Sequence, residues 1–449
     1  MQCRFIDRAR ELAALSEAFA KRPGFVILYG RRRIGKTRLV REWLRGLGAR
    51  YVYFVAQLSS HEHNLLELSA LAAEQLGEPS LRDLRPRRLD SLLRLVARMG
   101  ADVIVIDEFT YWVRVAPRVL SELQYFIDHD LPGTRSLLVV SGSLVGVMER
   151  SVLGGGSPLY GRANARLRLG PLSYRYLREF VPQLSPSDRV RLYALVGGIP
   201  FYLCLAHSAT SLKQAIRELI LSPAAPLLYE KDFILREELR DPHTYNAVLA
   251  AIAKGYTTPG KIAEVTGLDP SHAHKYLRVL EYLGIVERRA PLFKKKGRYW
   301  INDPVIRTWF VLIEPVLELI ELGELNEAEK KILERIDTYT APLWEELVRS
   351  HLLTRHAPIG YDVAGFLEHK GEEVDIAILD TEEKRAIVAE AKWSTLSLRE
   401  AKRLREETKR KAERLLPREY RVEQVYVAAR EIHGEKPSWV ITPLDLEKE

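Results

Sequence analysis

The chain contains 449 residues, which corresponds to about three domains of ordinary size. Hydrophobic residues make up 47% and charged residues 29% of the sequence, a composition that excludes a disordered tail protein and a fibrous repeat. Lysine and arginine number 68 against 60 aspartate and glutamate, and this net charge of +8 is compatible with nucleic-acid contact without indicating it.

The first 170 residues alternate short apolar runs of strand length with longer runs of helical periodicity, which is typical of a parallel sheet in an α/β domain. From residue 173 to about 242 the periodicity is purely helical. Residues 243–304 show three helices and two short strands, and a helical segment at 305–340 leads to a second α/β unit at 341–449. The strands expected in the first part are 25–29, 51–55, 103–106, 137–140 and 165–169, and the helices are 8–20, 37–47, 65–76 and 89–99.

Residues 30–37 fit the phosphate-binding pattern G-x-x-x-x-G-K-[ST], between an apolar strand and an amphipathic helix. The two glycines allow backbone N–H groups to surround phosphate oxygens at the positive end of the helix. Lys36 would reach the β- and γ-phosphates of ATP, and Thr37 would hold Mg²⁺. The sequence therefore predicts Mg-ATP as the ligand, bound by Gly30, Arg31, Arg32, Arg33, Ile34, Gly35, Lys36, Thr37 and Arg38.

An apolar strand at 103–106 ends in two carboxylates, Asp107 and Glu108. In a parallel sheet this end lies beside the phosphate-binding loop, so Asp107 would support Mg²⁺ and Glu108 would orient or deprotonate the attacking water. The next strand leads to Ser143, whose hydroxyl could sense the γ-phosphate or the water. Arg162 could act as an arginine finger that neutralises charge in the transition state. Ordinary turn or surface roles for Ser143 and Arg162 stay open.

These motifs, together with the segments FIDR at 5–8 and GGIP at 197–200, resemble the archaeal ATPase family, which is similar to AAA+ and signal-transduction P-loop ATPases. The resemblance implies that Phe5 and Arg8 lie near the adenine. It also implies that Pro200 belongs to a helical lid over the nucleotide.

The same resemblance implies a sensor role for Ser143 and a finger role for Arg162, either in cis or in trans. A finger that acts in trans would require a homo-oligomer.

Residues 243–304 have the layout of a winged helix-turn-helix, with helices at 245–253, 261–266 and 271–283 followed by a hairpin. Ser271 can cap the third helix. Polar and basic groups on that helix and in the wing would contact the phosphates or base edges of DNA, although a protein-docking or structural role stays open. The predicted DNA contacts are Ser271, His272, His274, Lys275, Arg278, Lys295, Lys296 and Arg298.

The last part of the chain carries a second set of carboxylates. Asp375 on one expected strand and Glu390 and Lys392 on the next resemble the PD-(D/E)XK nuclease pattern. Alternation along a strand places Glu390 and Lys392 on one face, where two carboxylates could hold a divalent metal while the lysine steadies the attacking water. The resemblance adds Glu345 as an auxiliary acid, with a second Mg²⁺ or an Mn²⁺ as the ion. A binding module that does not cleave DNA is the alternative.

The expected fold is an α/β multidomain chain: a P-loop ATPase core with a parallel sheet (1–172), a helical lid (173–242), a winged helix-turn-helix (243–304), a helical linker (305–340) and a restriction-endonuclease-like domain (341–449). The expected function is Mg-ATP hydrolysis coupled to DNA binding or processing. The alternative is a signalling or regulatory switch whose winged helix and inactive nuclease-like domain dock partners or DNA without cleavage. Two cysteines and the absence of an apolar run of roughly 18 residues lead us to expect a soluble cytoplasmic protein with no membrane partner.

Overall fold

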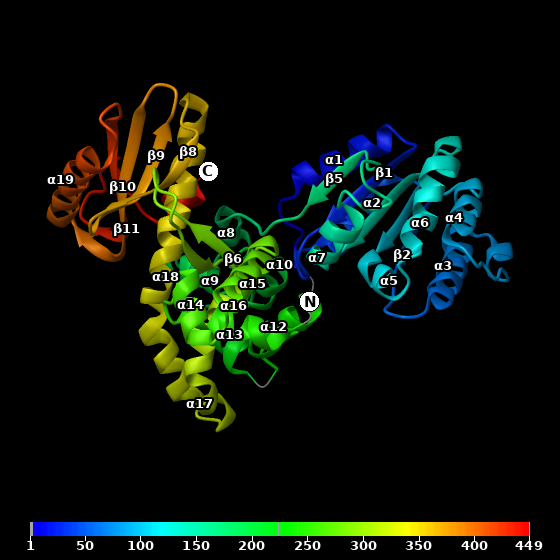
Figure 1. Ribbon diagram of the computed structural model, residues 1–449, viewed down its shortest axis with the longest axis horizontal. Coiled ribbons are helices and arrows are strands. Elements are labelled where there is room, and N and C mark those ends of the chain that lie inside the picture. Colours follow the sequence, from blue (N-terminus) through cyan, green and yellow to red (C-terminus); the bar gives the residue numbers. More distant parts are fainter. Residues whose placement is uncertain (1–2, 223, 240, 449) are drawn as a thin grey trace. The chain divides into compact units, whose positions relative to one another are not determined.

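A computed structural model describes residues 3–222, 224–239 and 241–448 (Figure 1). The described chain divides into two compact units, residues 3–171 and 172–448. No helix in the described part of the chain combines the length and the apolar character that a bilayer crossing requires.

The first unit is built on a five-stranded sheet in the order β2-β3-β4-β1-β5, in which every pairing is parallel. The strands form because their apolar residues can be buried, as in β1, where Phe25 to Leu28 are inaccessible to solvent. The strands are β1 (Gly24–Tyr29), β2 (Tyr51–Val55), β3 (Val103–Asp107), β4 (Leu137–Gly142) and β5 (Ala165–Arg168). The helices are α1 (Ala9–Ala20), α2 (Lys36–Leu47), α3 (His61–Leu76), α4 (Leu89–Arg98), α5 (Phe109–Val115), α6 (Val119–Tyr125) and α7 (Val145–Val147).

One large apolar cluster holds α3, α4, α5 and α6 against one face of this sheet. Trp112, Phe126 and Leu68 from the helices pack there with Ile104 and Ile106 of β3. Because all five strands are parallel, the ends of β1, β3 and β4 that carry the loop at 30–35, the carboxylates and the serine lie at one edge of the sheet.

The second unit begins with short helices: α8 (Leu177–Phe180), α9 (Pro186–Val196), α10 (Pro200–Leu205), α11 (Leu212–Ile216) and α12 (Pro226–Glu238). Three further helices and a hairpin then form the helix-turn-helix region and its wing. These are α13 (Pro242–Ala253), α14 (Pro259–Thr266), α15 (Pro270–Tyr282), β6 (Val286–Arg289) and β7 (Arg298–Ile301).

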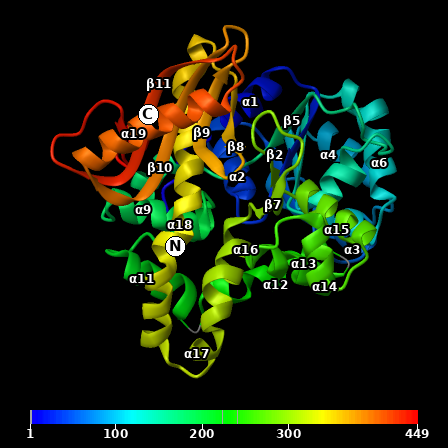
Figure 2. The same ribbon diagram turned by 60° about the vertical axis from the view of Figure 1, so that its left-hand side comes forward.

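The segment between the wing and the last sheet differs from the expectation. After α16 (Pro304–Thr308) and α17 (Leu317–Glu321), a single helix, α18 (Leu325–His356), runs for 32 residues with Pro342 inside it, and so crosses the boundary expected between the linker (305–340) and the last domain (341–449) (Figure 2). An internal proline costs a helix about 3 kcal/mol. Ile332 and Ile336 are buried before the proline and Val348 and Leu352 after it, so packing of both halves outweighs that cost.

The C-terminal sheet is mixed and has the order β12-β11-β10-β9-β8. Strands β8, β9 and β10 are antiparallel neighbours, and β10, β11 and β12 are parallel neighbours. Helix α19 packs on it through Ala412, which shares an apolar cluster with Val388 and Val425. The elements are β8 (Val363–His369), β9 (Glu372–Asp380), β10 (Arg385–Ser397), α19 (Leu398–Leu415), β11 (Arg421–His433) and β12 (Val440–Ile441).

Candidate functional site

The loop after β1 has the backbone that phosphate binding requires. A Cβ atom at Gly30 would lie 2.5 Å from the carbonyl oxygen of Leu169, and φ at Gly30 is +153°. Gly35 has φ of +99° and immediately precedes α2. Any residue with a side chain would be strained at either position, so the tight turn of the chain requires glycine here.

The Lys36 side chain is buried inside this loop. Its ammonium group donates to the carbonyl oxygens of Gly30 at 2.9 Å and Arg31 at 3.3 Å. The positive charge is therefore held within the curve of the loop, at the positive end of α2, where a phosphate group would meet it.

Two arginines of the loop have contacts or a backbone conformation of their own. Arg32 donates to the Tyr111 hydroxyl at 3.4 Å, and Arg33 has a left-handed backbone with φ of +67°.

Asp107 is the centre of a buried hydrogen-bond cluster. The Thr37 hydroxyl donates to its Oδ2 at 2.6 Å, and the hydroxyls of Tyr53 and Ser141 donate to the same carboxylate. Burial and the charge of Asp107 raise the pKa of Tyr53, which keeps its hydroxyl a donor. The adjacent Thr37 and Asp107 oxygens fit Mg²⁺, which takes few protein ligands and completes its shell with water and phosphate.

Glu108 lies next to Ser143. The Ser143 hydroxyl donates to Glu108 Oε2 at 2.5 Å, and the Ser143 backbone N–H donates to the same oxygen at 3.2 Å. The backbone at Glu108 is left-handed, with φ of +52°, which turns its side chain from the end of β3 toward β4. The carboxylate therefore has a fixed position beside the loop and the Asp107 cluster.

The N-terminal segment lies on the start of α2. The Arg38 guanidinium donates to the carbonyl oxygen of Cys3 and lies 6.0 Å from the ring centroid of Phe5. Arg8 is buried and donates to Glu11 at 3.0 Å and to the carbonyl oxygen of Gly170 at 2.6 Å. Phe5 is thus beside the phosphate-binding helix, while the charge of Arg8 is used in local contacts.

Arg162 is at the other edge of the sheet. Asn164, two residues later, receives a hydrogen bond from the backbone N–H of Phe25 at 2.7 Å, at the beginning of β1. Gly30 is five residues further along this strand, which is about 16 Å at 3.3 Å per residue. Arg162 instead forms a two-pronged ion pair with Asp128, at 2.7 and 2.9 Å. Strand direction therefore separates Arg162 from the loop of its own chain in this structure, and its role as an arginine finger, in cis or in trans, stays a prediction.

Pro200 starts α10 in the second unit. The preceding Gly198 packs so closely on Leu172 that a Cβ atom would lie 1.8 Å from the Leu172 carbonyl oxygen. The Leu172 backbone N–H also donates to the Gly198 carbonyl at 2.7 Å. The GGIP segment therefore packs on the first residue of its unit.

The predicted contacts on α15 are exposed as a group. His272, His274, Lys275 and Arg278 all lie on its outer surface, while Ala273 and Leu277 face the core. The capping prediction was wrong: Asp269 caps the helix and accepts from the Ser271 backbone at 2.8 Å and from the Ser271 hydroxyl at 2.6 Å. Pro270 occupies the first helical position, and the capping residue is therefore Asp269, which directly precedes it.

The wing does not project freely from the second unit. The Leu292 backbone N–H donates to the carbonyl oxygen of Phe366 in β8 at 2.8 Å, and the Leu292 side chain packs against Gly365. Arg298 donates to Glu368 of β8 at 3.0 Å. Lys295 and Lys296 remain exposed at the tip, whereas the charge of Arg298 is paired with Glu368, and the DNA contacts of all three stay a prediction.

The C-terminal carboxylates come together as expected from strand alternation. The Lys392 ammonium lies 2.8 Å from Glu390 and 3.6 Å from Asp375, and the Ala391 backbone N–H donates to Asp375 at 2.9 Å. Burial and the charges of Asp375 and Glu373 raise the pKa of Glu345 to about 7. No group of three or more histidine, cysteine or carboxylate side chains is arranged to hold a metal ion within residues 3–222, 224–239 and 241–448. In this structure the Lys392 ammonium lies between the two carboxylates, and the second metal centre stays a prediction.

Comparison with known proteins identifies the family. Residues 5–205 match the family described as an ATPase domain predominantly from Archaea. Over 418 residues, 91% of this chain and 92% of the relative, the sequence is 31% identical to the uncharacterized protein MJECL04 of Methanocaldococcus jannaschii. The chain belongs to the archaeal ATPase family.

Among solved structures, this archaeal ATPase is similar to the Walker-type ATPase paby2304 of Pyrococcus abyssi, with a TM-score of 0.53 and 21% identity over 68% of this chain and 96% of the other. That likeness supports the fold. Residues 247–290 match the IclR helix-turn-helix domain, and residues 309–404 match a family of archaeal and bacterial proteins of unknown function. The archaeal ATPase thus carries a P-loop domain, a helix-turn-helix and a C-terminal mixed-sheet domain.

Two residues of the Asp107 cluster escaped the sequence patterns of the archaeal ATPase. Tyr53 lies on β2 and Ser141 on β4, the two strands that flank β3. The pairing of Val55 with Asp107 and of Val140 with Ile106 brings both hydroxyls to the carboxylate. A polar residue within each apolar strand was the signal that the sequence offered. Only the strand order shows that these two residues lie beside Asp107.

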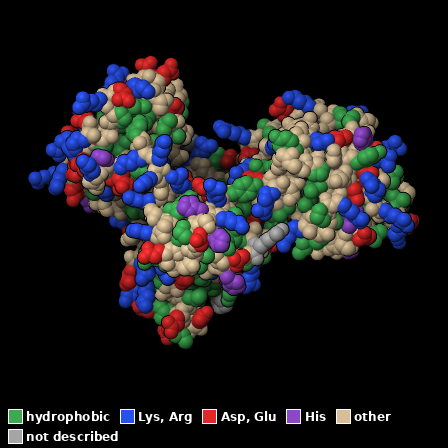
Figure 3. Space-filling model, in the orientation of Figure 1, with side chains coloured by type: hydrophobic (Ala, Val, Ile, Leu, Met, Phe, Trp, Pro, Cys, Tyr) green, Lys and Arg blue, Asp and Glu red, His purple; other side chains and the backbone are tan. Residues whose placement is uncertain are grey.

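Figure 3 shows lysine and arginine side chains over the visible faces of both units of the archaeal ATPase, with acidic side chains between them. The net charge of +8 is therefore distributed, and the position of a nucleic-acid site has to be argued from individual residues.

Proposed function

We propose that this archaeal ATPase binds and hydrolyses Mg-ATP and couples the nucleotide state to DNA binding through its winged helix. The observation that carries the proposal is the 2.6 Å contact between Thr37 and Asp107 beside the buried ammonium of Lys36. A metal-binding pair and a phosphate-binding cation adjoin one glycine loop, which is the combination that nucleotide hydrolysis needs.

The residues of the chain would act in a defined order. Lys36 would exchange its carbonyl contacts for phosphate oxygens when the nucleotide binds. Thr37 and Asp107 would hold Mg²⁺, whose charge would neutralise that of the phosphates. Glu108 would then accept a hydrogen bond from the attacking water and take up its proton. Ser143 would hold the carboxylate in place for this step.

DNA binding rests on the helix-turn-helix match and on the exposed cations of α15. Lys275 and Arg278 lie on one side of this helix, where they can reach phosphates or base edges in a major groove. The remaining contacts proposed on this helix are Ser271, His272 and His274.

The C-terminal domain favours DNA gripping over metal-dependent cleavage. Asp375, Glu390 and Lys392 keep the PD-(D/E)XK spacing, but Lys392 contacts both carboxylates and Glu345 is held toward its protonated form. In this arrangement the Lys392 ammonium partly balances the charge of both carboxylates, which favours contact with DNA over metal-dependent cleavage. The regulatory alternative, a switch that docks DNA or partners without cutting, uses the same contacts.

The proposal is tested by phosphate release from ATP and by binding of a labelled duplex to the full-length protein. Lys36→Ala should abolish hydrolysis, whereas Lys254→Ala, an exposed lysine of the second unit, should leave it unchanged. Duplex affinity should differ between the ATP and ADP states and fall in Lys275→Ala. Hydrolysis that survives Lys36→Ala would refute the proposal. Incubation of DNA with Mg²⁺ or Mn²⁺ should give no cleavage that depends on Asp375.

A further inference from the structure

The tip of the wing and the C-terminal sheet form one continuous surface. Leu292 fastens the wing loop to this sheet, since its side chain packs against the apolar cluster of β8, β9 and β10 and its N–H donates to β8. The next residue, Phe293, points outward and is 55% exposed. Its backbone is left-handed, with φ of +65°, a conformation that a residue with a Cβ atom rarely adopts.

An aromatic ring of the C-terminal domain meets Phe293 on this surface. The ring centroids of Phe293 and Tyr420 are 5.7 Å apart in an edge-to-face arrangement. The Lys384 ammonium, from the turn between β9 and β10, lies 5.4 Å from the Tyr420 ring centroid. Tyr420 therefore supports Phe293 from one side and leaves a face of the phenylalanine ring exposed.

Cations surround this aromatic pair. Three consecutive lysines follow Phe293 in the wing, all of them exposed, and exposed Lys384 and Arg418 lie in the adjoining turns of the C-terminal domain. The wing and these turns together carry five such cations against three acidic side chains, so this set of residues is net positive. The wing lysines are Lys294, Lys295 and Lys296, and the acidic neighbours are Glu382, Glu383 and Glu419.

We propose that this composite wing surface, made of Phe293, Lys294, Lys295, Lys296 and Lys384, binds a single-stranded segment of nucleic acid. The inference rests on the proposed DNA function and names a second contact within it. A base can stack on the exposed face of Phe293 while the lysines meet the phosphates on either side, which is how sequence-independent single-strand sites are built. Duplex DNA keeps its bases stacked inside and offers no base to this ring, so the partner is an unpaired strand.

The composite surface is preorganised for this ligand. The hydrogen bond from Leu292 to Phe366, the packing of Leu292 on Gly365 and the ion pair of Arg298 with Glu368 hold the wing on β8 without the ligand. Binding therefore does not need to order the loop, and the aromatic and basic groups keep their relative positions.

The test is fluorescence anisotropy of the nucleotide-free, full-length protein with a labelled 20-residue oligo(dT), and with a labelled duplex in parallel. Phe293→Ala should weaken oligo(dT) binding about tenfold, and Phe293→Trp should retain it because tryptophan also offers a stacking face. Lys384→Ala should weaken binding about two- to threefold and reduce its salt dependence. Lys370→Ala, an exposed lysine at the turn between β8 and β9, is the matched control and should behave as wild type.

The outcomes separate this inference from the proposed function. Duplex binding that depends on Lys275, without Phe293-dependent binding of oligo(dT), would overturn the composite wing surface and leave the function intact. Oligo(dT) binding that depends on Phe293 and Lys384, without a contribution from α15 to duplex binding, would support the surface and overturn the role of α15. Binding of neither DNA would overturn both.

Discussion

Thr37 and Asp107 are 70 positions apart in the chain, and their side chains meet at 2.6 Å. Thr37 lies in the first turn of α2 and Asp107 ends β3, with β4 between β3 and β1 in the sheet. The contact exists because three parallel strands end at one edge, where a hydroxyl and a carboxylate can share one Mg²⁺. The proposed ATPase activity depends on this pair.

Thr37→Val should lower ATP hydrolysis at least about tenfold, because valine keeps the volume of threonine and removes the oxygen that would face Mg²⁺. Thr37→Ser keeps a hydroxyl and should retain most of the rate. Phosphate release measured over a range of Mg²⁺ concentrations checks this, and chelation with EDTA should stop the wild-type reaction. A normal rate in Thr37→Val would place the metal elsewhere.

Glu108→Gln should reduce the rate of hydrolysis by about 10² to 10⁴ while ATP still binds, since the amide cannot accept the proton of water. Ser143→Ala should also slow the reaction, and the double variant should lose less than the sum of the two effects because the side chains are in contact at 2.5 Å. Single-turnover rates and equilibrium ATP binding are the measurements. Glu67→Gln, an exposed glutamate of α3, is the control.

Arg162→Ala should hydrolyse ATP at the wild-type rate when the protein is dilute and monomeric, because Arg162 lies about 16 Å along β1 from its own loop. Loss of the partly exposed ion pair with Asp128 should cost under about 1 kcal/mol of stability. If a second copy supplies Arg162, the specific activity of the wild type should rise with protein concentration and that of the variant should not. A slower monomeric variant would contradict the placement of Arg162.

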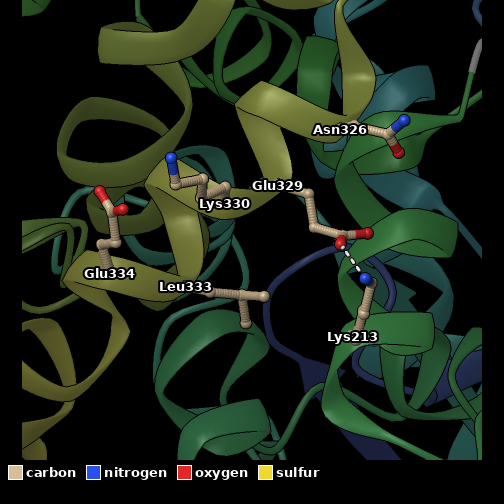
Figure 4. Close-up of a pocket in the computed structure, with 6 residues that line it drawn as sticks. All are labelled: Lys213, Asn326, Glu329, Lys330, Leu333 and Glu334. Carbon is tan, nitrogen blue, oxygen red and sulfur yellow. Dashed lines mark ion pairs between the residues drawn. The ribbon is translucent and has the colours of Figure 1, made fainter.

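Glu329 should make a pH-dependent contribution to the stability of the second unit. Figure 4 shows Glu329 on α18 with its ion pair to Lys213 of α11. The two charged groups are 2.7 Å apart in a groove of about 500 Å³, and Arg217 also donates to Glu329. Burial alone would raise the pKa of Glu329, but Arg217 and Lys213 hold it below its ordinary value. A carboxylate with a lowered pKa stabilises the fold above its unfolded pKa, and that stabilisation is lost as pH falls through the folded pKa.

Glu329→Gln should therefore lower the free energy of unfolding by about 1–2 kcal/mol at pH 7. The difference from wild type should shrink as the pH falls below about 4, as denaturant titrations at several pH values can show. Glu334→Gln, a neighbouring glutamate of the same groove, is the control. If Glu329→Gln lowered the free energy of unfolding equally at pH 7 and below pH 4, the charge of Glu329 would play no part in stability.

Local patterns determined much of this protein. Neighbouring residues in the chain are enough to predict the GRRRIGKT loop, the apolar strands that precede it and Asp107, and the helices α13, α14 and α15. The reason is that glycine conformations, helical periodicity and the apolar pattern of a strand are local properties. The parallel sheet followed from the alternation of strands and helices, so the placement of Asp107 beside the loop could be expected from the sequence.

Tertiary structure decided what depends on strand order and on packing between domains. Tyr53 and Ser141 reach Asp107 because β2 and β4 flank β3, and Arg162 is distant because β5 runs parallel to β1. Leu292 ties the wing to β8, and this contact creates the surface around Phe293. Sequence periodicity carries no information on which elements become neighbours, since that choice is made by the burial of apolar faces far apart in the chain.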